Sequence, residues 1–149
     1  DLDHWRVLGA LASDNAVPGS SGLASIERLA RAGRFDAPKL HRLVTVLDAL
    51  DVQMPIPLWE AASRTPQPTD GHLPATGVLA ELKSASDKGD GARAILRTGQ
   101  AMGPATAAEA NLLTLGDVIR ALKNVGLTRE ARALAIEALI ETWPTTAGR

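Results

Sequence analysis

The chain of 149 residues contains no cysteine, which excludes disulfide bonds and thiolate chemistry. A protein without cysteine persists in either redox environment, so this absence leaves the compartment undetermined. The sequence also lacks any apolar run approaching the roughly 20 residues that a membrane-spanning helix needs. We therefore expect a soluble chain with no membrane span.

Aromatic residues are scarce: there is no tyrosine, one phenylalanine and three tryptophans. β-Branched residues are also few, whereas alanine and leucine supply most of the 45% hydrophobic fraction. Alanine and leucine favour helices, while β-branched and aromatic residues are the usual strand formers, so this composition favours an all-α fold. The apolar fraction is large enough for a core in one domain or in two small lobes.

The chain has no excess of charge of either sign, with a formal net charge of −1. Up to His72 there are seven basic and nine acidic residues, and after it there are nine and eight, so the halves carry −2 and +1. Neither half has the strong positive field that nucleic-acid binding requires. We expect no nucleic-acid partner.

Apolar residues recur at helical spacing along most of the chain. This pattern predicts seven or eight helices, near residues 3–13, 23–33, 37–50, 57–62, 78–86, 92–102, 107–125 and 129–142. We expect them to form antiparallel helical hairpins, stacked as a short solenoid or an irregular bundle. The segment 65–73 carries two prolines and a glycine. It is the predicted linker and hinge between an N-terminal helical lobe (1–64) and a C-terminal hairpin lobe (74–143), unless both form one continuous domain.

Three side chains have the chemistry and position of helix N-caps. Asp36 precedes Pro38, a residue that the first turn of a helix tolerates because no helical hydrogen bond is lost there. Thr106 and Glu109 have the spacing of a capping box. Thr128 follows a glycine joint and can cap the last helix. These positions predict where three of the helices begin.

Glycines punctuate the predicted helices. Helix–turn–helix joints are predicted at Gly33, Gly89 and Gly126. Gly116 lies inside the strongest amphipathic stripe, where it weakens the helix by about 1 kcal/mol relative to alanine. Gly99 and Gly103 have a small-xxx-small spacing, but their flanks are polar. We interpret this pair as a point of close helix packing or of helix termination rather than as a membrane dimer motif.

The segment 126–139 resembles the turn and second helix of a tetratricopeptide repeat. The family's glycine and two small residues fall on Gly126, Ala131 and Ala138. A second partial match places Ala92, Gly99 and Pro104 in the same pattern, 39 residues earlier rather than the family's usual 34. The preceding helix departs from the family, because its expected Trp, Gly and Tyr fall on Leu115, Ile119 and Leu122. The resemblance implies a scaffold of helical hairpins that binds proteins.

The C-terminal lobe is also similar to the helical C-terminal part of long, uncharacterised bacterial envelope proteins. This second resemblance implies a bacterial source, favours the periplasm over the cytoplasm, and brings no known activity. The chain begins at Asp1 without a methionine. We expect a processed chain or a piece of a longer protein.

The sequence offers no convincing metal or catalytic pattern. His4, His41 and His72 lack any close ligand spacing, and we expect surface or packing roles for each. The stretch 87–91 superficially matches a calcium loop, but its third, fifth and twelfth positions are Gly89, Gly91 and Thr98, so the ligand set fails. We therefore predict no catalytic residue, no cofactor and no metal.

The candidate partner-binding residues are Trp5, Trp59, Trp143 and Ile140. A buried tryptophan would fill a gap between alanine-rich helices, and an exposed one would be a binding hot spot. The core is the favoured place for each tryptophan, and Trp143 is expected to be the most peripheral. An apolar edge on the last helix would come from Leu134, Ile136, Ile140 and Trp143. A basic cluster on the first hairpin is interpreted as a solvated face: Arg28, Arg31, Arg34, Lys39 and Arg42.

The function favoured by these observations is a non-catalytic scaffold or protein–protein interaction module. A protein or peptide partner could dock in a groove between paired helices, and a homo-oligomer stays open. The alternative is an accessory helical domain of a larger enzyme whose catalytic part lies outside this chain. A third, weaker hypothesis is an enzyme with an unrecognised site, which would need a cleft with convergent ionisable groups.

Overall fold

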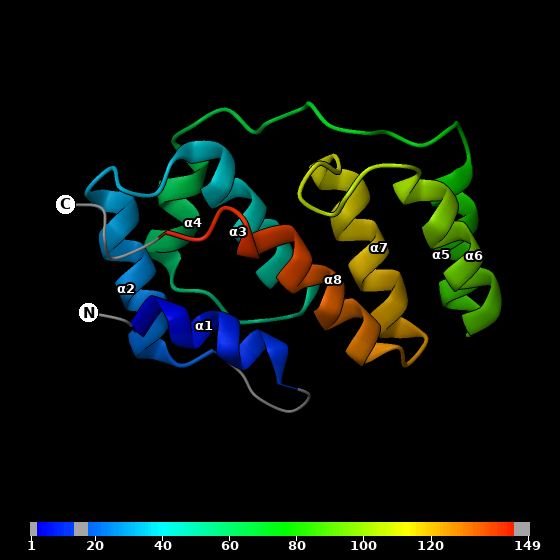
Figure 1. Cartoon of the computed structure of the whole chain (residues 1–149), viewed down its shortest axis with the longest axis horizontal. Coiled ribbons are helices and arrows are strands. Elements are labelled where there is room, and N and C mark those ends of the chain that lie inside the picture. Colours follow the sequence, from blue (N-terminus) through cyan, green and yellow to red (C-terminus); the bar gives the residue numbers. More distant parts are fainter. Residues whose placement is uncertain (1–2, 14–17, 145–149) are drawn as a thin grey trace.

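A computed structural model describes residues 3–13 and 18–144 of the chain, and Figure 1 shows its architecture. The fold is all-α, as predicted, and the described residues form no strand; their only strand-like pairing is an isolated parallel bridge between His72 and Ala110. None of the described helices is long and apolar enough to cross a membrane. The helices are α1 (Asp3–Ala12), α2 (Ser20–Arg31), α3 (Ala37–Ala49), α4 (Ile56–Ser63), α5 (Val78–Asp87), α6 (Gly91–Met102), α7 (Leu112–Asn124) and α8 (Thr128–Ile140).

The helix starts confirm one predicted cap and correct two. The Asp36 carboxylate accepts the backbone N–H of Lys39 at 3.1 Å, as predicted. Thr128 is the first residue of α8 rather than its cap, because Leu127 occupies the capping position and offers no side-chain hydrogen bond. The predicted turn glycines at 33, 89 and 126 all have positive φ.

Helix α7 begins later than the capping box predicts. The backbone N–H of Thr106 does donate to Glu109 Oε2 at 3.4 Å, but this pair closes only a turn. The helix starts at Leu112, and its cap is Asn111. The backbone on either side of Ala110 is engaged with His72 in the isolated bridge, so it cannot enter a helix before that pairing ends.

Helix α7 is the centre of the molecule and packs against α3, α5, α6 and α8. Consecutive helices pack as pairs in α1–α2, α5–α6 and α7–α8, while α3 also contacts α4. In Figure 1 the α7–α8 pair lies between α3 and the α5–α6 pair, so the spatial order differs from the order along the sequence. The long connection between α4 and α5 runs across the molecule and leads the chain to the α5–α6 pair (Figure 1).

Helices from both predicted lobes contribute to one hydrophobic core. Its largest fully buried side chains include Leu11, Ile26, Leu43, Leu47, Leu58, Leu82, Leu115, Ile119 and Leu139. Two glycines allow helices to approach closely within it. A Cβ on Gly22 would lie 2.7 Å from Val7 Cγ2, and one on Gly116 would lie 3.3 Å from Thr45 Cγ2. The glycine that weakens α7 locally therefore permits its contact with α3.

The connection between α4 and α5 is held against the segment that joins α6 to α7. Asn111 Nδ2 donates to the carbonyls of Thr69 and Asp70 at 3.0 and 3.1 Å. The N–H of Asn111 donates to the carbonyl of His72 at 3.3 Å, and a Cβ on Gly71 would lie 2.6 Å from Asn111 N. We call residues 65–73, the predicted linker, the strap. Asn111 thus serves both as a helix cap and as the anchor of the strap.

Candidate interaction face

A half-open hollow of about 290 Å³ lies between α3, α4 and α7, and we call it the Trp59 hollow. Val44 of α3, Ala62 of α4 and Leu112 of α7 are buried residues that line it. Its other lining residues are His41, Thr45, Asp48, Trp59, Ser63, Gln67, Leu113 and Arg120. Three helices and one residue of the strap thus build a depression with a mixed lining of five apolar and six polar or charged residues.

The rim of the Trp59 hollow exposes large apolar side chains. Trp59 is 42% exposed and Leu113 is 64% exposed. Ile56 precedes Trp59 by one helical turn on α4 and is also mostly exposed. Large apolar groups gathered beside a hollow are typical of a surface that binds another molecule.

A second hollow, of about 330 Å³, lies on the other side of α7 against α5. Leu79 and Leu82 of α5 line it together with charged residues. Lys83 and Asp87 pair there at 2.9 Å, and this hydrogen bond raises the pKa of Lys83. Because both charges are exposed and paired within one helix, they add little to stability and offer no isolated charge to a ligand.

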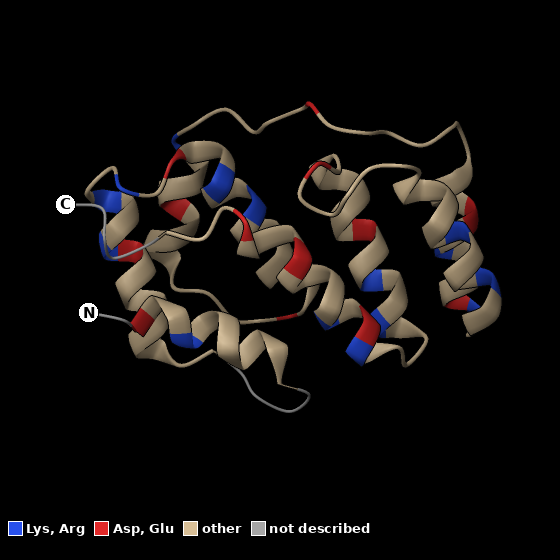
Figure 2. Cartoon of the chain, in the orientation of Figure 1, with Lys and Arg blue, Asp and Glu red and all other residues tan. Residues whose placement is uncertain are grey.

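Ion pairs join α7 to α3 and to the turn that follows α3. Arg120, which lines both, lies 2.9 Å from Asp48 and 3.6 Å from Asp117. Lys123 of α7 pairs with Asp51, which follows α3 in a left-handed conformation. Figure 2 shows charges of both signs distributed over these helices rather than a field of one sign.

The three histidines do not form a cluster, and each contacts a different part of the chain. His4 is buried, and its Nε2 lies 3.1 Å from the carbonyl oxygen of Pro144. His41 Nε2 lies 3.0 Å from Thr65 Oγ1, and His72 takes part in the backbone bridge. Among the described residues, no three His, Asp or Glu side chains gather as a metal site would require.

The predicted basic cluster does not form one patch. Arg42 turns inward and donates to the carbonyls of Ala107 and Ala110 at 2.9 and 3.0 Å. Burial lowers the pKa of Arg42, and the nearby Asp70 partly offsets this effect. Arg31 pairs with Glu27 at 2.9 Å. The solvated-face interpretation holds for Arg31, whereas Arg42 is a structural clamp between α3 and the segment before α7.

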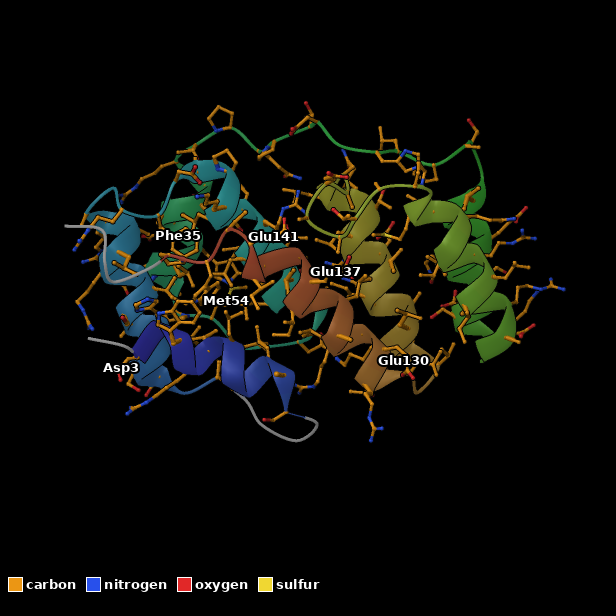
Figure 3. The ribbon with its side chains drawn as sticks, in the orientation of Figure 1. Asp3, Phe35, Met54, Glu130, Glu137 and Glu141 are labelled. Atoms are coloured by element: carbon orange, nitrogen blue, oxygen red, sulfur yellow. The ribbon has the colours of Figure 1, made fainter. Side chains whose placement is uncertain are left out.

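The tryptophans are buried in the reverse of the expected order. Trp143 is only 5% exposed, and its ring meets Phe35 edge-on with centroids 6.1 Å apart. Figure 3 places Phe35 beside the chain that follows α8. Trp143 thus lies in the core as expected, but its ranking as the most peripheral tryptophan is wrong, because the segment after α8 folds back onto the turn between α2 and α3. The core placement expected for Trp5 and Trp59 is wrong, since they are 38% and 42% exposed, and Ile140 is also exposed.

The last helix is not the uncovered edge that the sequence predicts. Helix α8 is covered by α1, α3 and α7, which leaves Leu134 and Ile136 half-buried. The Glu137 carboxylate also accepts the N–H of Ala107 at 3.4 Å (Figure 3). The predicted apolar edge on the last helix is therefore largely covered, except at Ile140.

Sequence reasoning overlooked Leu113 as a surface residue. It follows Leu112, and neighbouring residues on a helix point about 100° apart, so the two leucines face different sides of the first turn of α7. The hydrogen bond from its N–H to Asn111 Oδ1 at 3.0 Å fixes the start of α7 and turns Leu113 outward. The paired leucines were the available signal, but they become interpretable only once the helix start is known.

No family model, no curated protein and no solved structure shows a significant match to this chain. The resemblance of 126–139 to a tetratricopeptide repeat therefore stays a prediction, as does the similarity to bacterial envelope proteins. Any statement about function depends on the geometry of the exposed faces.

Proposed function

We propose that this chain is a non-catalytic helical scaffold that binds a protein partner through the Trp59 hollow. The observation that carries the proposal is the exposure of Trp59 and Leu113 on the rim of a hollow that buried apolar side chains help to line. Tryptophan is enriched at binding hot spots because it offers a large, rigid contact area at a small entropic cost.

The polar groups around the hollow favour a protein partner over a charged small molecule. His41 already contacts Thr65, and Arg120 is paired with Asp48. Burial of the exposed Trp59 and Leu113 is the main interaction that the hollow can still offer a partner. A volume of about 290 Å³ is at the lower limit of small-molecule pockets, which suits a few side chains of a docked protein.

Site-specific photo-crosslinking in the host organism tests this proposal. A benzophenone amino acid replaces Leu113 on the rim, and a matched control replaces Ala133, an exposed residue of α8, a helix that contributes no residue to the hollow. We expect a crosslinked species from position 113 and none from position 133.

A second change gives this experiment its specificity. Trp59→Ala in the position-113 variant should remove most of the crosslinked species, while Trp5→Ala, at a similarly exposed tryptophan, should leave it intact. Equal crosslinking from positions 113 and 133, or none from either, contradicts a binding role for the hollow.

A further inference from the structure

The chain leaves for α5 and returns from α6 at the same place. His72, which precedes α5, and Ala110, which follows α6, meet in the isolated parallel bridge. The N–H of His72 donates to the carbonyl of Glu109 at 3.4 Å, and the N–H of Asn111 donates to the carbonyl of His72 at 3.3 Å. The two ends of the segment that holds α5 and α6 therefore lie side by side. We call residues 78–102 the α5–α6 hairpin and the other described helices the body.

The place of attachment is fixed to the body, whereas the two ends of the hairpin carry glycine. Arg42 and Asn111 tie the segment before α7 to α3 and to the strap. Gly77 stands directly before α5 with φ 91°, and Gly103 stands directly after α6 with φ 56°. Hinges are a few residues at the ends of elements that absorb large changes in φ and ψ, and glycine has the widest range of both. Each end of the hairpin thus has a residue suited to a hinge.

The hairpin buries little large apolar surface. Leu82 is its one contribution to the largest fully buried side chains of the described chain. Both helices pack on each other and on α7, mostly through small side chains. Hydrophobic stabilisation grows with the apolar area removed from water, and segments with little buried apolar surface open at a lower free energy than the whole fold. The buried residues of the hairpin are Leu82, Ala85, Ser86, Ala94, Ala101 and Met102.

Three buried hydroxyl groups on α5, α6 and α7 lack a hydrogen-bond partner among the described residues: those of Ser86, Thr98 and Thr114. Ser86 lines the hollow between α5 and α7. Thr114 lies on the same stripe of α7 as Ala121, which lines that hollow too. A buried hydroxyl without a partner has lost its hydration without compensation. Separation of the hairpin from α7 would return Ser86 and Thr114 to water, which favours the open state.

We propose that the α5–α6 hairpin is a hinged unit, which opens away from α7 at Gly77 and Gly103 while the body stays folded. Opening uncovers the stripe of α7 that carries Thr114 and Ala121, so access to this face of α7 depends on the hinge. The inference is separate from the Trp59 hollow, to which the hairpin contributes no residue. Ion pairs within the hairpin are kept during this movement: Glu81–Arg97, Lys83–Asp87 and Asp90–Arg93.

Thiol labelling of the purified chain measures this opening, because the sequence contains no cysteine. Ser86→Cys places a thiol on the hairpin side of the contact, and Thr114→Cys places one on the α7 side. The controls are Ala49→Cys in α3 and Ala138→Cys in α8. All four positions are at most 6% exposed, so each thiol reacts when the structure around it opens. Labelling rates are measured in water and in low urea, relative to the unfolded chain of the same variant, and circular dichroism checks that each variant is folded.

We expect positions 86 and 114 to label at one common rate, at least about 30-fold faster than positions 49 and 138. Their labelling should also depend less on urea, because opening of the hairpin exposes less surface than global unfolding. Thr114→Val keeps the shape of the side chain and removes its unpaired hydroxyl. In the Ser86→Cys background it should slow labelling by about ten-fold, since the closed state no longer buries that group.

Three results overturn the proposal. The first is equal labelling with equal urea dependence at all four positions, which would mean that the hairpin opens only when the whole chain unfolds. The second is a large difference between the rates at positions 86 and 114, because one opening exposes both. The third is a Thr114→Val variant whose position 86 labels as fast as before.

Discussion

Helices α6 and α7 are alike in length and general pattern but differ in how many helices surround them. They contain 12 and 13 residues, both carry apolar residues at helical spacing, and each has a glycine in its interior. Helix α7 is enclosed by four neighbours and buries Leu115 and Ile119 completely. Helix α6 packs against α5 and α7, buries mainly alanines, and leaves Ile95 and Leu96 outside. The comparison teaches that apolar spacing predicts a helix, whereas its neighbours decide which apolar side chains are covered.

The largest expected difference between the two helices comes from truncating one leucine in each. Leu115→Ala should destabilise the fold by about 3 kcal/mol, because it removes a fully buried side chain and leaves a cavity. Leu96→Ala should change the unfolding free energy by less than about 0.5 kcal/mol, since Leu96 is mostly exposed. Urea unfolding at low protein concentration measures both values, and equal losses would show that α6 is covered within the monomer.

The next largest effect on stability is expected from replacing Asn111, the residue that caps α7. Asn111→Ala removes a helix cap and two hydrogen bonds to the strap, and it should cost about 2 kcal/mol. Asn111→Asp keeps the capping oxygen but replaces the Nδ2 donors with a carboxylate oxygen that faces the carbonyls of Thr69 and Asp70, so its cost is the lost strap bonds together with this repulsion. Both variants should speed amide exchange at residues 69–72. An aspartate variant as stable as wild type would show that the strap bonds contribute nothing.

The two interior glycines allow a smaller and more selective comparison. Gly99→Ala should stabilise the monomer by up to about 1 kcal/mol, since its Cβ meets nothing. Gly116→Ala gains the same helix propensity, but its Cβ would lie 3.0 Å from Arg120 Nη1 and 3.3 Å from Thr45 Cγ2. We therefore expect Gly116→Ala to be less stabilising than Gly99→Ala in thermal unfolding. The reverse order would mean that the α3–α7 contact is loose.

The smallest expected effect is the ion pair between α3 and α7. Asp48 and Arg120 are each about half exposed, so their coupling free energy should be about 0.5 kcal/mol. A double-mutant cycle with Asp48→Ala and Arg120→Ala measures it, and the coupling should shrink as salt is added. A coupling free energy of several kcal/mol would show that the pair is less accessible to water than its exposure indicates.

Helix positions and several turns were predictable because their causes are local. Asp36 caps α3 within one helical turn, and Gly126 turns the chain between two neighbouring helices. The start of α7 was not predictable, because Asn111 is selected over Thr106 by pairing with the distant His72. The burial of Trp143 depends in the same way on Phe35, which lies far away in the sequence.

The candidate interaction face was predictable only in part. Trp59 belonged to the predicted set because an exposed tryptophan near a helix end is a plausible anchor. The sequence could not show that α3, α4 and α7 enclose a hollow beside it, since that depends on the order in which the helical pairs pack. The sequence also ranked Trp143 as the most peripheral tryptophan, whereas Trp143 is buried and Trp59 is exposed.

Hydroxyl-radical footprinting tests the central claim most directly, because Trp59 and Trp5 are exposed to similar extents in the free chain. The modification of each ring is compared between the dilute purified chain and the chain inside its host. If the Trp59 hollow binds a partner, Trp59 is protected in the host by several-fold relative to Trp5. An unchanged ratio of the two modifications would contradict the account.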